Sequence, residues 1–483
     1  MLRSVGKLAA KIRTALGDTT PESVQLAKAE TFSSGSLEAA HEYAVAQGLQ
    51  LAGKWQESIP HYTRATQLDP DMGRAYAGLA AVSANAGRTE DAEKYYQLAM
   101  ARIDRMTDRE KFRTRGGYYL IKREPRKAID EYTALVQQFP FDDAGHSNLA
   151  VAYMLLHDVP KALAESRGTV KVSHNKLARM NLAIYSIYGG DFQGGIKEAQ
   201  AILDQGVQDV DMYWVVAMGQ LGLGQIPQAT ETYHKMEKVD AFGASIAAIG
   251  LADIALYQGS PNDSIPLLDK GIATDLASKD QAAAAAVKLT ALGYAHLLAG
   301  RKAQALAAID RAVRLDKSEP TLFNSGRVYI EAGQPNKALS LASQLQARIE
   351  PEAQMYGKLL EGDARLSHGD VKQAIALFQA AQNIADSWLG RFDLGKAYLQ
   401  AGLYTEAYTE FESCLKRRGE ASAIFVDDVP TYRFFPPLYY YLGRAQEGLK
   451  SPAAKDSYGS FVKLQEKGIG PLLDDARKRL ASN

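Results

Sequence analysis

Glycine recurs along this chain at intervals of about 34 residues, and this rhythm limits the possible folds more than any other feature of the sequence. One such interval separates Gly53 from Gly87, and another separates Gly300 from Gly333. The full series consists of Gly53, Gly87, Gly190, Gly224, Gly259, Gly300, Gly333, Gly369 and Gly402, with Arg123 and His157 at the same place in two intervening units. Such a period indicates one small supersecondary unit that stacks on copies of itself.

The residues around each glycine predict a helix, a turn and a second helix. Glycine ends the first helix because a residue without Cβ adopts the left-handed cap at little cost. After Gly87, the small Ala92, the bulky Tyr96 and the small Ala99 follow at i, i+4 and i+7, on one face of the second helix. Eight positions into several first helices stands another small residue: Ala80, Gly116, Ala150, Gly293, Gly326, Gly362 and Gly395.

This joint pattern of glycine, alanine, aromatic residue and period resembles the tetratricopeptide repeat from about residue 37 to residue 466. The resemblance implies an all-α fold, a right-handed α-solenoid superhelix of about 12 helix-turn-helix units. Because repeats of this kind have no assembled catalytic centre of their own, the expected function is binding.

Breaks in the rhythm predict how the chain is organised. The interval from Gly259 to Gly300 is lengthened, and residues 416–437, KRRGEASAIFVDDVPTYRFFPP, separate two helix pairs. We call residues 416–437 the insert, and expect it to be ordered and to fold into the groove through Tyr432, Phe434 and Phe435. The expected segments are an N-terminal helix and linker at 1–36, repeats at 37–258, further repeats at 259–415, the insert at 416–437, and a last repeat with a capping helix at 438–483.

The N-terminus, MLRSVGKLAAKIRTALG, is basic and amphipathic. It lacks the continuous apolar core of a secretory signal, and no stretch of the chain approaches the roughly 18 apolar residues of a membrane span. We interpret it as a first helix packed on the part of the chain that follows; a helix on a membrane surface is the alternative.

Composition and motifs argue against several function classes. The 56 basic residues equal the 56 acidic ones, which disfavours nucleic acid as a partner. The single cysteine, Cys414, rules out an intramolecular disulfide framework. The sequence holds no HExxH, paired CxxC, Walker-type loop or GxSxG, and its eight histidines do not pair at ligand spacing. We therefore expect no catalytic activity, no cofactor and no metal; Asp427 and Asp428 could hold a cation, but capping or solvation is the preferred interpretation.

In tetratricopeptide arrays the first helices line a concave groove, and the resemblance places particular side chains there. The corresponding positions change from polar to apolar along the chain: Arg74, Asn85 and Arg113, then Met154, Met180, Ile184, Tyr188, Trp214 and Met218. One interpretation is a groove for a protein, peptide or lipid-like ligand, because methionine and aromatic side chains suit adaptable contacts. The other is that tight winding buries these residues against each other.

Three segments resemble a more particular setting. They are the N-terminal KLAAKIRTALGD with the following first repeat, MTDREKFRTRGGYYL, and KRRGEASAIFVDDVPTYRFFPPLYYYLGRAQEGL. Together they are similar to the repeat region C-terminal to the kinase domain in bacterial, often acidobacterial, serine/threonine kinases, although no kinase motif is present. The expected function is a non-catalytic scaffold or sensor, and the alternative is a regulatory subunit or detached sensor region of such a kinase. The resemblance also implies that the opening helix within residues 1–36 is the tail of a preceding domain. The chain would be cytoplasmic if free-standing and extracytoplasmic if part of a membrane-spanning kinase.

Overall fold

The computed structural model describes residues 34–172, 176–278, 281–466 and 468–482. The expected helix within residues 1–33 lies outside this part of the chain. The chain forms two compact units, which we call unit 1 (residues 1–182) and unit 2 (residues 183–483), and each is treated separately. The described residues form α-helices and short 3-10 helices and contain no strand. Every one of these helices is too short or too polar to span a bilayer.

Unit 1 consists of consecutive helices that pack in pairs. Its helices are α3 (Leu37–Leu51), α4 (Trp55–Leu68), α5 (Gly73–Asn85), α6 (Thr89–Met100), the 3-10 helix η1 (Ile103–Arg105), α7 (Asp108–Ile121), α8 (Pro125–Gln138), α9 (Asp143–Met154) and α10 (Val159–Val172). Helix α11 (Lys176–Tyr188) contains the boundary between the units.

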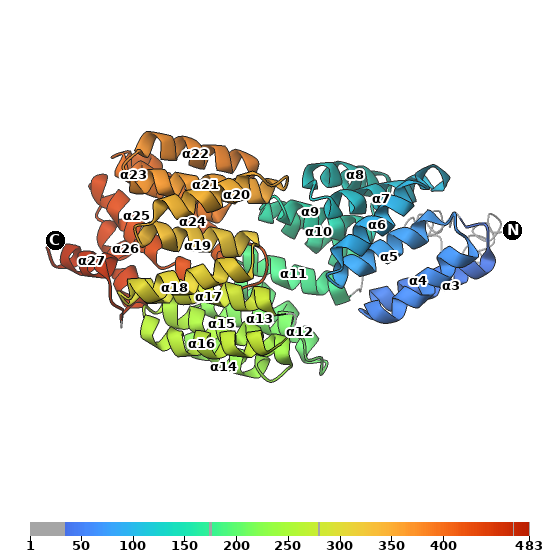
Figure 1. The fold of residues 1–483 in the computed structure, drawn as a ribbon, viewed down its shortest axis with the longest axis horizontal. Coiled ribbons are helices and arrows are strands. Elements are labelled where there is room, and N and C mark those ends of the chain that lie inside the picture. The colour runs from blue at the N-terminus through green and yellow to red at the C-terminus, as the bar shows by residue number, and fades with distance from the viewer. Residues whose placement is uncertain (1–33, 173–175, 279–280, 467, 483) are drawn as a thin grey trace. The chain divides into compact units, whose positions relative to one another are not determined.

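Unit 2 continues the same arrangement, and Figure 1 shows α19 to α24 as successive layers of paired helices. Its helices are α12 (Phe192–Leu203), α13 (Val210–Gly222), α14 (Ile226–Met236), α15 (Ala241–Tyr257), α16 (Pro261–Ala277), α17 (Ala282–Leu298), α18 (Lys302–Leu315), α19 (Glu319–Glu331), α20 (Pro335–Gln346), α21 (Pro351–Ser367), α22 (Val371–Ile384), α23 (Trp388–Gln400), α24 (Tyr404–Lys416), η2 (Arg418–Ser422), η3 (Tyr432–Phe434), α25 (Pro437–Gly448), α26 (Ala454–Leu464) and α27 (Pro471–Ser482). From α3 to α26 these make twelve pairs, so the predicted all-α solenoid of about 12 units is confirmed.

The predicted role of the periodic glycines is confirmed by their backbone geometry. All nine have positive φ angles, for example 76° at Gly53 and 75° at Gly402. Arg123 and His157, which replace glycine in the series, also have positive φ, at 55° and 57°. The turn therefore keeps its left-handed conformation even where the side chain makes that conformation costly.

Arg123 gives a direct test of this cost. We expect Arg123→Gly to raise the free energy of unfolding of unit 1 by about 1 kcal/mol, because glycine removes the Cβ strain at a left-handed cap. Urea unfolding followed by the fluorescence of Trp55, which lies on α4, measures the change. Lys94→Gly in the middle of α6 is the control and should lower stability by about 1 kcal/mol. Equal destabilisation by both substitutions would contradict the argument.

The small residues of the first helices allow the second helices to approach closely. A Cβ added at Gly116 would lie 2.5 Å from the Tyr132 ring, and one added at Gly395 would lie 2.5 Å from the Phe411 ring. The aromatic residues of the second helices thus fill the space that the glycines leave on the first helices. In each helix pair this contact holds the first helix against the second. The first helices form the inner face, where the candidate site of unit 2 lies.

Between Gly259 and Gly300 the extra residues lengthen the helices. Both α16 and α17 have 17 residues, whereas α18 has 14. Between these two neighbouring helices the Lys288 ammonium lies 2.6 Å from the Asp275 carboxylate, and both side chains are buried. The extra residues of this interval therefore lie within helices.

Candidate functional site

The insert runs across the inner face of unit 2, against the first helices of several successive pairs. The Tyr188 hydroxyl donates to the Asp428 carboxylate at 2.6 Å, and the Tyr356 hydroxyl donates to the carbonyl oxygen of Ile424 at 3.1 Å. These hydrogen bonds connect the insert to α11 and α21. The insert therefore covers part of the face that these first helices form.

One buried ion pair fixes the insert to α15. The Arg433 Nη1 donates to Asp253 Oδ1 at 2.8 Å and to the Pro430 carbonyl oxygen at 2.8 Å. The backbone N–H of Arg433 donates to the same Asp253 oxygen at 3.2 Å. Burial raises the pKa of Asp253, and Arg433 partly offsets this effect. Arg433 therefore stabilises the charged form of a carboxylate that water cannot solvate.

The three aromatic residues predicted to make contacts from the insert lie against the inner helices. Tyr432 stacks on Tyr257 of α15 with ring centroids 5.4 Å apart, and on Phe435 at 5.0 Å. Phe434 lies 5.4 Å from the ring of Tyr294 on α17. Tyr432 and Phe435 are buried, whereas Phe434 lines a cavity.

The apolar residues predicted to line the groove have a different environment from the polar ones. In unit 2, Tyr188, Trp214 and Met218 are at most 2% exposed, and Trp214 packs against the Tyr188 ring at 5.9 Å. Since η2 of the insert packs on α13, these residues offer no open surface. Ile184 is partly buried. The interpretation of an open ligand groove therefore has to leave out Tyr188, Trp214 and Met218.

In unit 1 the predicted groove residues take part in local contacts. Arg74 donates to the Thr114 hydroxyl at 3.1 Å, and Arg113 binds the buried carboxylate of Asp142 at 2.7 Å. Asn85 is exposed at the end of α5, Met154 is buried and Met180 is partly buried. Arg113 is thus held by Asp142, and of the three polar positions Asn85 faces solvent most freely.

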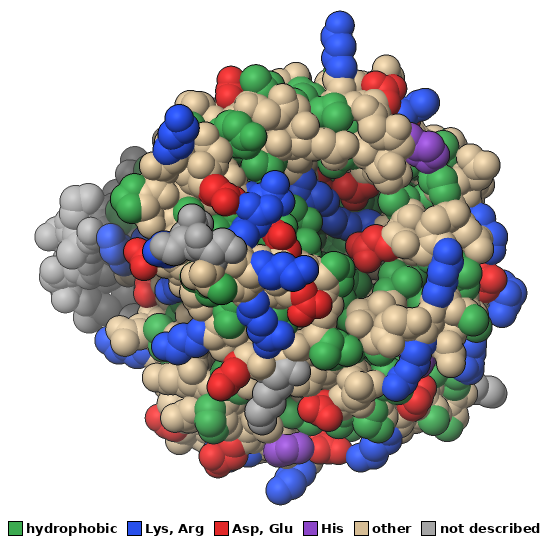
Figure 2. Space-filling view, turned by 90° about the vertical axis from the view of Figure 1, so that its left-hand side faces the viewer, with side chains coloured by type: hydrophobic (Ala, Val, Ile, Leu, Met, Phe, Trp, Pro, Cys, Tyr) green, Lys and Arg blue, Asp and Glu red, His purple; other side chains and the backbone are tan. Residues whose placement is uncertain are grey.

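A cavity of about 580 Å3 remains open beside the insert in unit 2. It lies between the inner faces of α17, α19, α21, α23 and α25, and is closed on one side by the insert and by the segment that leads into α27. Figure 2 shows a hollow in which acidic and basic side chains gather. Both charged and aromatic residues line the cavity, and this combination distinguishes it from the filled part of the inner face.

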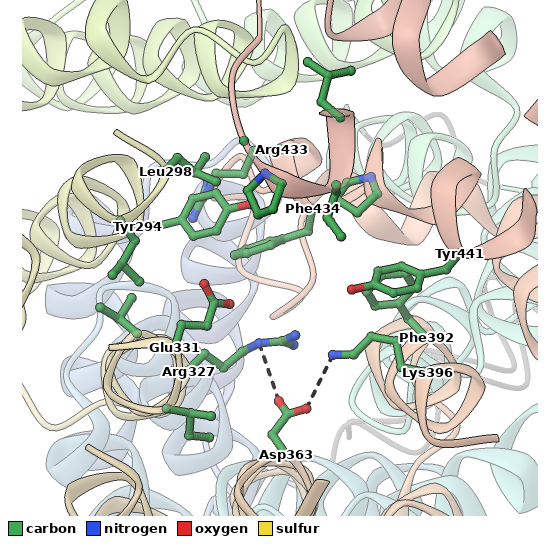
Figure 3. Close-up of a pocket in the computed structure, with 18 of the residues that line it drawn as sticks. Tyr294, Leu298, Arg327, Glu331, Asp363, Phe392, Lys396, Arg433, Phe434 and Tyr441 are labelled. Carbon is green, nitrogen blue, oxygen red and sulfur yellow. Dashed lines mark ion pairs between the residues drawn. The ribbon is translucent and has the colours of Figure 1, made fainter. Parts of the chain in front are cut away.

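Four charged residues on three inner helices form a cluster in the cavity wall, which we call the charged cluster: Arg327, Asp363, Asp393 and Lys396. Arg327 donates to both oxygens of Asp393 at 3.2 Å, and the Lys396 ammonium lies 2.8 Å from Asp393. Asp363 lies between the two cations, at 3.6 Å from Arg327 and 3.5 Å from Lys396, as Figure 3 shows. Two positive and two negative charges therefore balance one another.

The protonation of the cluster follows from its burial. Asp393 is fully buried, and burial together with Asp393 raises the pKa of Asp363. Burial opposes the charge of Lys396, but Asp363 and Asp393 more than offset it and raise the pKa of Lys396 above its usual range. Lys396 therefore stays protonated and is bound by acids, so it is unsuited to act as a base or a nucleophile.

The other groups considered for chemistry are metal-binding side chains and the single thiol. No group of three or more His, Cys, Asp or Glu side chains in this part of the chain is placed to hold a metal ion. Cys414 is buried beneath Trp388, and burial raises the pKa of its thiol well above the usual range, so the reactive thiolate is suppressed.

The charged cluster was not predicted, although the sequence contains a signal for it. Arg327, Asp363 and Lys396 each follow directly the small glycine of their first helix, which is Gly326, Gly362 or Gly395. They thus occupy one repeat position in three units that follow one another, and the repeat geometry brings them to the same inner face. Asp393 does not share this position.

Two family models described as tetratricopeptide repeat match the chain, one at residues 49–104 and the other at residues 249–320 and 359–423. A curated relative is the "Transcription activator GutR" of Bacillus subtilis (strain 168), which is 27% identical over 127 residues. That match covers 25% of this chain, and the chain spans 14% of the length of that relative.

Several solved structures are similar in part. The APC/C hetero-tetramer Cut9-Hcn1 has 13% identity and a TM-score of 0.33, covering 80% of this chain and 91% of that one. The human IFIT1 dimer with PPP-AAAA has 14% identity and a TM-score of 0.37, covering 89% and 91%. PilW, a type IV pilus biogenesis factor, has 13% identity and a TM-score of 0.33, covering 42% and 94%. At these scores nothing about function is transferred.

Proposed function

Because this chain is a tetratricopeptide-repeat protein, we propose that it is a non-catalytic interaction module that holds a protein or peptide segment on the inner face of unit 2. The observation that carries the proposal is the cavity of about 580 Å3 between the first helices α17 to α25. Ligand sites typically have volumes of about 300 to 1,000 Å3, so the cavity has room for a few side chains of a bound segment.

The filled and open parts of the inner face support this location. Trp214 and Tyr188 are covered, so a ligand there would first have to displace the insert. At the cavity, by contrast, Glu331, Ser367 and Gln400 keep exposed side chains. We therefore propose the cavity as the binding site, and Asn85 as a separate contact position of unit 1.

Blocking the cavity tests the proposal. Peptides would be selected from a displayed random library on the wild-type chain, and their dissociation constants measured by fluorescence anisotropy. We expect Gln400→Trp, which places a bulky ring at the cavity, to weaken their binding about tenfold or more, equivalent to about 1.4 kcal/mol. Glu406→Trp is the control, because Glu406 is exposed on the second helix α24 and does not line the cavity.

Two outcomes would contradict the proposal. One is a failure to select any peptide that binds the folded chain. The other is equal binding of the selected peptides by the wild type and by both tryptophan variants, which would locate the binding surface elsewhere. Circular dichroism of each variant would establish that the helices are retained.

For the partner, we propose a signalling enzyme such as a serine/threonine kinase. The support is the similarity of three sequence segments to the repeat region of bacterial kinases, and none of the proteins compared above is a kinase. Co-purification of this chain with a kinase encoded next to it would support the proposal. A neighbouring kinase that neither binds this chain nor changes its activity in the presence of the chain would argue against it.

A further inference from the structure

Among the charges that line the cavity, Glu331 differs from the others because it has no ion-pair partner among the described residues. The charged cluster is balanced, and Arg433 is bound to Asp253. Glu331 is exposed at the C-terminal end of α19, one helical turn after Arg327. Because the charges of the cluster and of the Arg433–Asp253 pair cancel, Glu331 leaves one net negative charge at the cavity surface.

The surroundings of Glu331 disfavour its charged form, although the end of its side chain reaches solvent. Partial burial in the cavity wall raises the pKa of the Glu331 carboxyl, and Arg327 and Lys396 partly offset this effect. The strongest hydrogen bonds of both cations go to Asp393, so they are not free to bind Glu331 as well. A cation that enters the cavity would meet a carboxylate that has no ion-pair partner among the described residues.

Aromatic side chains stand on both sides of this carboxylate. Tyr294 lies against Phe434, and Tyr441 lies against Phe392 with ring centroids 5.6 Å apart. Figure 3 shows the Tyr294 and Phe434 rings above Glu331 and the Tyr441 and Phe392 rings across the cavity. Aromatic faces attract organic cations, and their apolar surface suits the methylene groups that carry such a cation.

Resting on the proposed function of this site, we propose that the cavity recognises the charged side chain of a lysine or arginine in the bound segment, with Glu331 as its carboxylate partner and Tyr294 and Tyr441 as its aromatic walls. A carboxylate or phosphate is disfavoured because Arg327 and Lys396 are already bound by acids, while Glu331 and Asp363 would repel it. A neutral apolar side chain would fill the cavity but leave Glu331 without a partner.

Four small probes that share one backbone test the charge preference. They are the N-acetyl methylamides of lysine, arginine, norleucine and glutamate, and ligand-observed NMR measures their dissociation constants for the full chain. We expect the lysine and arginine probes to bind about tenfold more tightly than the norleucine probe, and the glutamate probe to bind most weakly. Equal binding of the norleucine and lysine probes, or tightest binding of the glutamate probe, would overturn the proposal.

A matched pair of variants locates the preference. Glu331→Gln keeps the size of an exposed side chain and removes its charge, and should reduce the preference for lysine over norleucine to about twofold or less. Glu406→Gln on the outer helix α24 should leave it unchanged. An unchanged preference in Glu331→Gln would overturn the assignment of Glu331.

The same peptides distinguish failure of this inference from failure of the proposed function. If the library peptides lose affinity for Gln400→Trp but bind Glu331→Gln and the wild type equally, the cavity binds peptides without a cation preference. If the peptides bind Gln400→Trp as tightly as the wild type, the proposed site itself is wrong.

Discussion

Replacing Arg433 with alanine is expected to lower the free energy of unfolding of unit 2 by about 3 to 5 kcal/mol, the usual cost of leaving one partner of a buried ion pair uncompensated. Asp253 is 1% exposed and Arg433 is 3% exposed, so water cannot replace the lost guanidinium. The Pro430 carbonyl oxygen also loses its donor. Urea unfolding followed by tryptophan fluorescence measures the effect, because Trp388 packs against Phe435 of the insert.

The defect of Arg433→Ala should depend on pH. The pKa of Asp253 is already raised in the folded state, and removal of Arg433 would raise it further. An acid whose pKa is higher in the folded than in the unfolded protein lowers the free energy of unfolding as pH rises from about 4 towards its folded-state pKa. The defect should therefore be smaller at pH 5 than at pH 8.

A double substitution provides the control for the ion pair. Arg433→Met combined with Asp253→Leu removes both charges and should recover most of the stability, because no buried charge is then left without a partner. A loss below about 1 kcal/mol in Arg433→Ala would show that the pair does not hold the insert.

Gly419→Ala is expected to prevent the insert from docking at the turn between α11 and α12. A Cβ at this position would lie 2.2 Å from the carbonyl oxygen of Ile187, 2.5 Å from the backbone nitrogen of Gly190 and 2.6 Å from the carbonyl oxygen of Tyr188. Since backbone atoms cannot rotate away as a side chain can, we expect a loss of about 2 to 3 kcal/mol in the stability of unit 2.

Limited trypsin digestion tests this second prediction. Once the insert is detached, cleavage after Arg417, Arg418 and Arg433 should become faster in Gly419→Ala than in the wild type. Gly459→Ala on α26 is the control, because a Cβ there would meet no atom within 4 Å and should stabilise the helix by about 0.5 to 1 kcal/mol. Equal cleavage rates in the two variants would contradict the docking role of Gly419.

Most of the helical architecture could be predicted from sequence, because its causes are local. The left-handed turn at Gly53 needs a residue without Cβ, and the pairing of Gly116 with Tyr132 needs a small side chain on one helix and a bulky one on the next. Such contacts form within one repeat, so they leave a regular pattern in the chain. The last helix pair, α25 and α26, lacks the glycine of this pattern, because Lys450 takes the left-handed position between the two helices.

The candidate site was only partly predictable for a different reason. The expected groove residues Trp214 and Met218 lie on an inner helix of unit 2, but the sequence left open whether they meet a ligand or other parts of the chain. In the folded protein both side chains are buried within unit 2. The repeat position after Gly326, Gly362 and Gly395 could have suggested the cluster of Arg327, Asp363 and Lys396, because one position in three successive units reaches the same inner face.

The sequence by itself therefore determined the repeat, its helix pairs and its turns, since these depend on sterics within about 34 residues. The tertiary structure alone decided that Arg433 meets Asp253 across 180 residues and that Arg327 meets Asp393 across 66. Both contacts join residues of different helix pairs, so they depend on how several pairs stack, which no single repeat encodes. In unit 2 this stacking places the insert against one part of the inner face and leaves the cavity beside Glu331 open.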